Sequence, residues 1–198
     1  MASFATQLVS PSRRALDAEL IERSLAGDRA AIRALHQHYF RIASSFLRKL
    51  GTRPNEIEDA CQEVFLQFFR YLPSFRGQAE LKTWLYKLCV TEARRARRRR
   101  HVTAALATLL RQEPLVESAP AATRSEATVQ ELAARALDRM APESRTVFVL
   151  FEMEGLTGKE ITTITGTSLA ATFRRLYEAR RIFREALGLE PVDEEATS

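Results

Sequence analysis

The chain has 198 residues, with 30 Lys and Arg against 25 Asp and Glu and a formal net charge of +5. No stretch approaches the roughly eighteen apolar residues of a membrane-spanning helix, and residues 1–14 lack the apolar segment of a secretory signal. The two cysteines cannot build a disulfide framework, so we expect a cytoplasmic protein with no direct membrane insertion.

The charge is distributed unevenly along the chain. Residues 16–100 carry 17 Lys and Arg against 10 Asp and Glu, whereas residues 189–198 carry four acids and no base. A basic N-terminal half favours a polyanionic partner such as nucleic acid. We expect the acidic tail to be solvated, and the alternative is that it shields the basic residues of the same chain.

Hydrophobic periodicity predicts an all-α fold, since apolar residues recur every three or four positions and no strand-like alternation occurs. Four helices are expected in the N-terminal half, at about residues 17–26, 28–50, 54–71 and 81–100. Four more are expected in the C-terminal half, at about residues 129–140, 142–151, 157–165 and 168–183. Residues 102–128 are rich in Ala, Thr, Ser and Pro, which is typical of a flexible linker and leaves room for a short helix at 103–112.

These patterns predict two small helical domains joined by a linker. The expected divisions are a disordered N-terminus (1–15), a first domain (16–101), the linker (102–128), a second domain (129–188) and the acidic tail (189–198).

Cations alternate with aromatic residues in the first domain. The segments 68–71 and 75–78 read Phe-Phe-Arg-Tyr and Phe-Arg-Gly-Gln, and six arginines fill residues 94–100 around a single alanine. Cations that neutralise phosphate beside rings that stack on bases are what a protein needs to hold unpaired nucleic acid. Trp84 is ambiguous, because its helical spacing with neighbouring leucines favours a core position over a stacking platform.

The C-terminal half contains a pattern typical of a helix-turn-helix. Thr157 and Glu160 form a capping box, Gly166 ends a short helix, and Ser168 can cap the longer, arginine-rich helix that follows. Guanidinium groups along such a helix suit phosphates and guanine edges. An ordinary helical hairpin with a charged face is the alternative.

The two halves together resemble a known family. Asp59-Ala-Cys-Gln-Glu-Val-Phe65, Phe75-Arg-Gly77 and Trp84-Leu-Tyr86 resemble region 2 of an extracytoplasmic-function sigma factor of the sigma-70 superfamily. Residues 138–187, with Lys159-Glu-Ile161, resemble region 4 of the same family.

The resemblance implies a sigma factor that binds core RNA polymerase and directs it to particular promoters. Region 2 would dock on the clamp helices of the β′ subunit, melt the −10 element and hold its unpaired strand. Region 4 would read the −35 element as duplex and touch the β flap. An anti-sigma factor is a further expected partner. Since the polymerase does the chemistry, we expect no enzyme activity, no small-molecule substrate and no cofactor or metal.

The resemblance also indicates site residues. Polymerase binding is expected at an acidic polar helix face formed by Asp59, Gln62, Glu63, Asn55 and Glu56, which would repel DNA. The expected −10 contacts are Arg76, Gly77, Gln78, Lys82, Lys87, Arg94, Arg95, Arg97 and Arg98. The expected −35 contacts are Lys159, Ser168, Ala170, Thr172, Phe173, Arg174, Arg175 and Arg180.

Two segments depart from the family pattern. Thr91 and Arg95 stand where many members have Asn and Asp, which puts the base preference at the −10 element in doubt. The recognition helix begins Leu-Ala-Ala-Thr-Phe-Arg over residues 169–174, with Phe173 in place of the usual Lys and Arg174 in place of the usual Ser. We therefore expect an unusual −35 sequence, with a weakened region 4 as the alternative.

Two other functions were weighed. A stand-alone helix-turn-helix regulator would need a dimer interface, and no heptad run supplies one. A metal-dependent nuclease using Glu56, Asp59 and Glu63 is disfavoured because these acids share one helix and no histidine lies beside them.

Overall fold

The computed structural model describes residues 11–109 and 128–189. The expectations for residues 1–10, for linker residues 110–127 and for tail residues 190–198 lie outside the described part of the chain.

The described residues form helices and no strands, which confirms the expected all-α fold of two helical domains. The N-terminal domain contains α1 (Pro11–Leu25), α2 (Arg29–Lys49), the 3-10 turn η1 (Pro54–Glu56), α3 (Ile57–Tyr71), the 3-10 turn η2 (Leu72–Ser74) and α4 (Leu81–Leu109). The C-terminal domain contains α5 (Val129–Arg139), α6 (Pro142–Phe148), the π-helical turn η3 (Val149–Met153), α7 (Gly158–Thr165) and α8 (Leu169–Ala186).

The core of the N-terminal domain lies where α2, α3 and α4 meet. Leu35, Phe68 and Leu85 come one from each helix, and their side chains are completely buried. Trp84 is half-buried and packs between Phe68 and Phe75, at ring-centroid distances of 5.2 and 5.4 Å. Trp84 is therefore part of the packed structure, which is the position that its helical spacing favoured.

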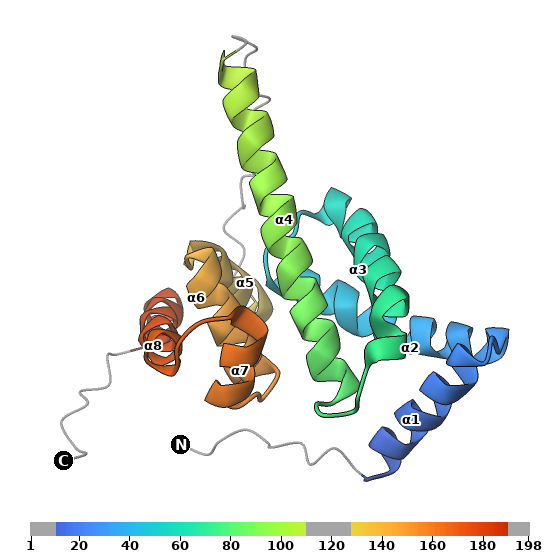
Figure 1. The fold of residues 1–198 in the computed structure, drawn as a ribbon. Helices are drawn as coiled ribbons and strands as arrows, with labels where there is room; N and C mark the ends of the chain where they lie inside the picture. Colours follow the sequence, from blue (N-terminus) through green and yellow to red (C-terminus); the bar gives the residue numbers. More distant parts are fainter. Residues whose placement is uncertain (1–10, 110–127, 190–198) are drawn as a thin grey trace.

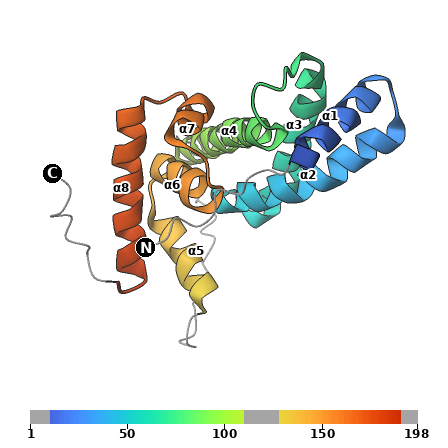
Figure 2. The ribbon, with the colours of Figure 1, turned by 90° about the horizontal axis from the view of Figure 1, so that it is seen from below.

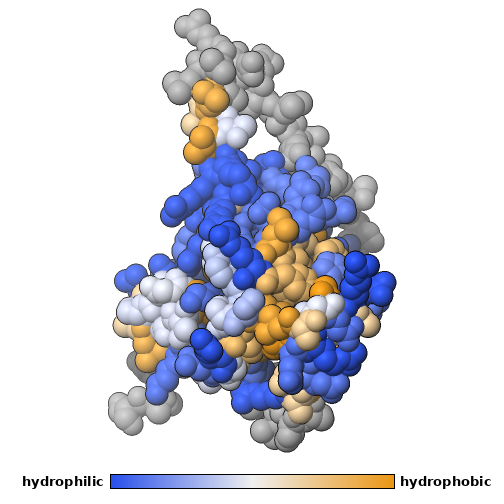
Figure 3. All heavy atoms as spheres, turned by 45° about the vertical axis from the view of Figure 1, so that its right-hand side comes forward, coloured by the Kyte–Doolittle hydropathy of each residue, from blue (hydrophilic) through white to orange (hydrophobic). Residues whose placement is uncertain are grey.

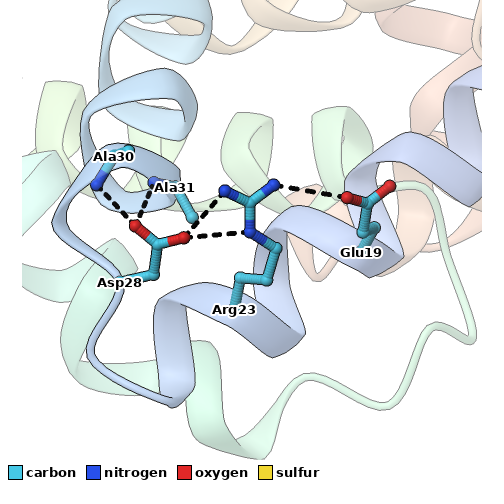
Figure 4. Close-up of polar contacts among 5 residues, drawn as sticks. All are labelled: Glu19, Arg23, Asp28, Ala30 and Ala31. Atoms are coloured by element: carbon cyan, nitrogen blue, oxygen red, sulfur yellow. Dashed lines mark hydrogen bonds and ion pairs between the residues drawn. The ribbon is translucent and has the colours of Figure 1, made fainter.

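The corner between α1 and α2 is fixed by a cap and an ion pair (Figure 4). Asp28 is the N-cap of α2, and its Oδ1 accepts hydrogen bonds from the backbone N–H groups of Ala30 and Ala31 at 2.8 and 3.3 Å. Its Oδ2 accepts from the guanidinium of Arg23, which also pairs with Glu19. These contacts hold α1 against α2.

Two helices are longer than expected. α1 begins at Pro11, so residues 11–15 are helical although we expected them to be disordered. α4 continues through Leu109, so residues 102–109 extend the basic helix and belong neither to the linker nor to a separate helix. Proline suits a first helical turn, and the Ala-rich sequence of 103–109 has high helix propensity.

In the C-terminal domain, α8 packs on α5 and α6 and lies on the side away from the N-terminal domain (Figure 2). α7 lies on the opposite side of this domain and packs against α4, which stands upright between the two halves (Figure 1). The two domains are therefore in direct contact along α4. None of the described helices is long and apolar enough to cross a membrane.

Candidate nucleic-acid interface

The acidic residues expected to bind polymerase lie on one side of the N-terminal domain. Asn55 follows Pro54 in η1, and Asp59, Gln62 and Glu63 lie on α3, where all four side chains are exposed. The opposite side of α3 carries Ile57, Cys61, Val64 and Phe68, which are buried. The amphipathic pattern of the helix therefore turns the polar set toward solvent.

Glu56 differs from the others, because it is half-buried and ion-paired with Arg100 of α4. A second acid, Glu92, is almost completely buried and receives a hydrogen bond of 2.7 Å from Arg99. Part of the arginine run thus serves the fold of its own domain. The surface over the middle of α4 is strongly hydrophilic, below an exposed apolar end of the helix that includes Val102 and Leu106 (Figure 3).

The loop between η2 and α4 presents Arg76, Gly77 and Gln78 to solvent. Gly77 has a φ of +67°, a left-handed conformation that residues with a Cβ rarely adopt. The loop is anchored behind these residues by Phe75 on Trp84. An exposed polar loop on an aromatic base can present its backbone and side chains to a ligand.

The α4 cations expected to contact the −10 element fall into two groups. Lys87, Arg95 and Arg98 are exposed. Lys82, Arg94 and Arg97 instead contact acceptors of the C-terminal domain: Glu154 at 3.2 Å, the Thr165 carbonyl at 3.1 Å and Glu143 at 2.6 Å respectively. Half of the expected −10 residues on this helix are thus covered by the other domain.

Glu154 lies at the centre of the domain interface. Its Oε1 accepts a hydrogen bond of 2.8 Å from Lys49 Nζ, and its Oε2 accepts from the hydroxyl of Tyr86 and lies 3.2 Å from Lys82 Nζ. Burial alone would raise the pKa of Glu154, but the hydrogen bonds and the two lysine charges hold that pKa below its usual value. The carboxylate is therefore charged at neutral pH.

Arg145 of α6 forms a second link between the domains. Its Nε donates to the Lys49 carbonyl at 2.5 Å and its Nη2 to the Arg48 carbonyl at 3.4 Å, at the C-terminus of α2. Its Nη1 pairs with Asp138 at 2.8 Å. A Cβ at Gly51 would lie 3.0 Å from the same guanidinium, so the glycine leaves room for it.

α7 and α8 form the helix-turn-helix. Thr157 and Glu160 make the capping box of α7, and Gly166 ends it with a φ of +71°. Ser168 caps α8, its hydroxyl accepting from Ala171 N at 3.2 Å. Local capping chemistry thus sets the turn that presents α8.

The exposed face of α8 includes Ala170, Phe173, Arg174 and Arg180, and Lys159 is exposed on α7. Arg175 is half-buried. Arg180 pairs with Glu152 at 2.7 Å within its own domain and lies over the ring of Phe151.

Thr172 corrects the sequence-based prediction. We expected Thr172 to contact the −35 element, but its side chain is completely buried and its hydroxyl donates to the Ser168 carbonyl at 3.0 Å. The same hydroxyl lies 3.1 Å from that of Thr167. Thr172 therefore fixes the turn of the motif and is not available to a base.

Phe173 packs sideways on the start of α7. A Cβ built on Gly158 would lie 2.9 Å from Leu169 Cδ1 and 3.2 Å from Phe173 Cζ. Both side chains remain about half exposed, at 44% for Leu169 and 48% for Phe173. The recognition helix thus begins with an apolar pair that depends on a glycine in the preceding helix.

Sequence reasoning missed the residues that join the domains. Lys49, Tyr86, Glu154 and Arg145 were not among the expected site residues. A capped helix end or a lone glutamate gives no periodic signal, and the partners lie up to 105 positions apart in sequence. Only the tertiary structure brings them together.

Among residues 11–109 and 128–189, no group of three or more His, Cys, Asp or Glu side chains is placed to hold a metal ion.

Comparison with known proteins is consistent with the two-domain layout. The family described as sigma-70 region 2 matches residues 33–103, and that described as sigma-70, region 4 matches residues 130–182. The RNA polymerase sigma-H factor of Pseudomonas aeruginosa is 28% identical over 184 residues, covering 86% of this chain and 93% of that protein. The ECF RNA polymerase sigma factor SigM of Mycobacterium tuberculosis is 29% identical over 177 residues, covering 87% and 85%.

Two solved structures share the fold. The sigma factor RpoE of Bartonella quintana, in complex with the anti-sigma factor NepR, superposes with a TM-score of 0.64 at 18% identity, covering 81% of this chain and 98% of that one. CnrH in complex with the cytosolic domain of CnrY gives a TM-score of 0.58 at 22% identity, covering 88% and 96%.

Proposed function

Because this chain belongs to the extracytoplasmic-function sigma factors of the sigma-70 family, we propose that its two domains divide promoter recognition between a melted and a duplex element. As a sigma factor, the chain binds core RNA polymerase and promoter DNA and directs transcription from specific promoters. The proposal assigns each of these contacts to a surface.

The polymerase contact is proposed for Asn55, Asp59, Gln62 and Glu63, with Glu56 at its edge. The support is an exposed acidic face opposite the apolar side of α3. Such a face repels DNA and complements a basic protein surface, as the clamp helices of the β′ subunit would provide. The β flap is the proposed contact of the C-terminal domain.

The −10 contact is proposed for the loop at 76–78 and for the cations of α4. Lys87, Arg95 and Arg98 are exposed and available, whereas Lys82, Arg94 and Arg97 become available when the C-terminal domain leaves α4. Contact of all six of these cations with the strand thus requires that the domains separate.

The −35 contact is proposed for the exposed face of α8. Arg174 and Arg180 suit phosphates or guanine edges, and the apolar pair Leu169 and Phe173 suits thymine methyl groups. Lys159 and the capped N-termini around Ser168 suit backbone phosphates, with Ala170 and Arg175 beside them. Thr172 is left out of this surface because it is buried.

An anti-sigma factor is the proposed regulatory partner. RpoE and CnrH, which share the fold, are each seen with such a partner or with a cytosolic domain of one. We also propose that the chain contributes no catalytic group and no cofactor site, since sigma factors act through the polymerase that they bind.

The observation that carries the proposal is the placement of the two exposed surfaces. An acidic face on α3 belongs to one domain, and an arginine-bearing helix is outermost in the other. The chain can therefore bind the polymerase through one domain and duplex DNA through the other at the same time.

Run-off transcription from a promoter library, with core polymerase and with or without the chain, tests the proposal. Enriched transcripts that share two spaced upstream elements are expected. The paired variant Asp59→Arg with Glu63→Arg should lose initiation but keep duplex binding, with Glu22→Arg on α1 as the exposed control. DNA binding without any chain-dependent initiation would instead support a stand-alone regulator.

A further inference from the structure

Three hydrogen-bond donors of the N-terminal domain converge on a single anion. They are Lys49 Nζ in the last turn of α2 and Lys82 Nζ and the Tyr86 hydroxyl one turn apart on α4. The anion in this structure is the carboxylate of Glu154, which comes from the other domain. The three donors belong to one domain, and their ligand does not.

Two of the three donors, Tyr86 and Lys82, have contacts within the N-terminal domain that position them. Tyr86 is 1% exposed, and its ring packs on Phe46 at a centroid distance of 4.2 Å, which fixes the hydroxyl at the surface of the core. Lys82 Nζ lies 5.4 Å from the centre of the same ring. Burial raises the pKa of the Tyr86 hydroxyl, so it remains a proton donor at neutral pH. These contacts position Tyr86 and Lys82 independently of Glu154, whereas the Lys49 ammonium contacts Glu154 itself.

Two ammonium groups and a neutral hydroxyl make a site for an oxyanion. A phosphate offers the same kind of acceptor oxygens as a carboxylate, and charge-assisted hydrogen bonds to either are short and strong. Glu154 can therefore stand in for a phosphate.

The position of the site on α4 points to phosphate in a polymer. Lys82, Tyr86, Arg94 and Arg97 follow one another at helical spacing and all donate to the C-terminal domain. They mark a row of donors about 22 Å long, taken at 1.5 Å per residue. A row of this kind fits a linear polyanion better than a single small anion.

We propose that Lys49, Lys82 and Tyr86 bind one backbone phosphate of the melted promoter strand, and that Glu154 occupies this phosphate site while the domains are in contact. The inference rests on the proposed function, and it adds Lys49 and Tyr86 to the DNA-binding residues. Since one site cannot hold both anions, strand binding and the domain interface exclude each other.

The test uses the holoenzyme and the −10 strand of a promoter obtained from run-off selection. Each phosphate is replaced in turn by a neutral methylphosphonate, and binding is measured by fluorescence anisotropy. We expect one position at which the replacement weakens wild-type binding on the order of tenfold. The same replacement should have a smaller effect in Lys49→Ala or Tyr86→Phe, because each variant lacks one of the three donors to that phosphate. Each lysine lost should also reduce the salt slope by about 0.7.

Arg33→Ala is the matched control, because it removes an exposed cation from the same helix at a distance from the site. Tyr86→Phe keeps the ring that packs on Phe46, so its effect separates the hydroxyl from the fold. If both site variants remain as sensitive as wild type to every methylphosphonate, the phosphate site is wrong. Initiation by the wild-type holoenzyme is scored separately, and its absence would contradict the proposed function instead.

The occupancy of the site by Glu154 is tested in the free full-length chain. Glu154→Gln should bind the −10 strand more tightly than wild type, by several-fold or more, because a weaker competitor remains in the site. Glu152→Gln removes an equal charge from an acid that pairs with Arg180 in its own domain and should leave strand binding unchanged. If wild type and Glu154→Gln bind the −10 strand equally well, Glu154 does not compete with the strand for this site.

Discussion

The two proposed DNA-binding surfaces of this sigma factor differ in what covers them. α8 lies on the outside of the molecule, and Arg174 on it is exposed. On α4, by contrast, Arg94 and Arg97 donate to Thr165 and Glu143 of the other domain. The chain in this form exposes its proposed duplex-reading surface, while the other domain contacts half of the cations proposed to bind the melted strand. If the proposed assignments hold, duplex recognition can precede strand capture.

The largest expected effect contrasts one exposed arginine with one covered arginine. Arg174→Ala should weaken binding of the free chain to a −35 duplex on the order of tenfold or more, because an exposed guanidinium can contact a base or phosphate directly. Arg97→Ala should leave that binding unchanged, since its partner is Glu143. Titration by fluorescence anisotropy measures both, and equal losses would show that the two surfaces are not separately available.

A second prediction concerns packing within the exposed surface. Gly158→Ala places a methyl group 2.9 Å from Leu169 and 3.2 Å from Phe173, and overpacking of this kind costs about 1–3 kcal/mol. We expect a lower Tm and weaker −35 binding. The double variant Gly158→Ala with Phe173→Ala should recover part of the Tm, because one of the two close contacts is removed, but not the −35 binding, to which Phe173 is proposed to contribute. Thermal unfolding followed by circular dichroism checks the stability. A simple sum of the two single effects would mean that the residues do not interact.

Acid should uncover the hidden surface. The hydrogen bond from Arg97 holds the pKa of Glu143 below its usual value against the opposing effect of burial, and the pKa of Glu154 is lowered as well. Since both values are depressed in the folded chain, the carboxylates stabilise the interface above the usual value of 4.5, and this contribution disappears as the pH falls through their lowered values.

Energy transfer between dyes on the two domains would follow this opening. No change is expected between pH 7 and pH 6, and separation is expected well below pH 4.5. The double variant Glu143→Gln with Glu154→Gln should lose most of the pH dependence in that range. If the double variant keeps the full pH-dependent change in energy transfer, groups other than Glu143 and Glu154 control the opening.

The smallest effect is expected at the corner of α1 and α2, far from both DNA-binding surfaces. Asp28→Ala removes the N-cap of α2 and the partner of Arg23, so a modest decrease in Tm is expected. Binding to the −10 strand and to the −35 duplex should not change. A loss of either would show that the corner is coupled to recognition.

The sequence was sufficient for features that repeat along a helix. The apolar positions of α3 and the caps at Asp28, Thr157 and Ser168 were predictable because each depends on neighbours within a few residues. The extension of α4 to Leu109 was not predicted, because the composition of residues 102–128 as a whole is typical of a linker. The first part of that segment is nevertheless rich in Ala and Leu, which favour a helix.

Features that depend on the second domain were not predictable in this way. Lys82, Arg94 and Arg97 share a periodic pattern with exposed cations, and only their tertiary contacts separate the two groups. Thr172 was misassigned although the sequence carried a signal, since its spacing of four and seven positions from Leu176 and Ala179 places it on the buried face of α8.

The position of Arg145 has a thermodynamic consequence. The last carbonyls of an α-helix have no partner within it, and here a guanidinium from α6 donates to that of Lys49 in α2 and also to that of Arg48, which accepts from the Gly51 N–H as well. One domain thus completes a helix of the other, so melting of either removes stabilisation from both. Calorimetry should therefore record a single cooperative endotherm for the closed chain and two independent endotherms once the domains are apart, although the chain is built from two folds.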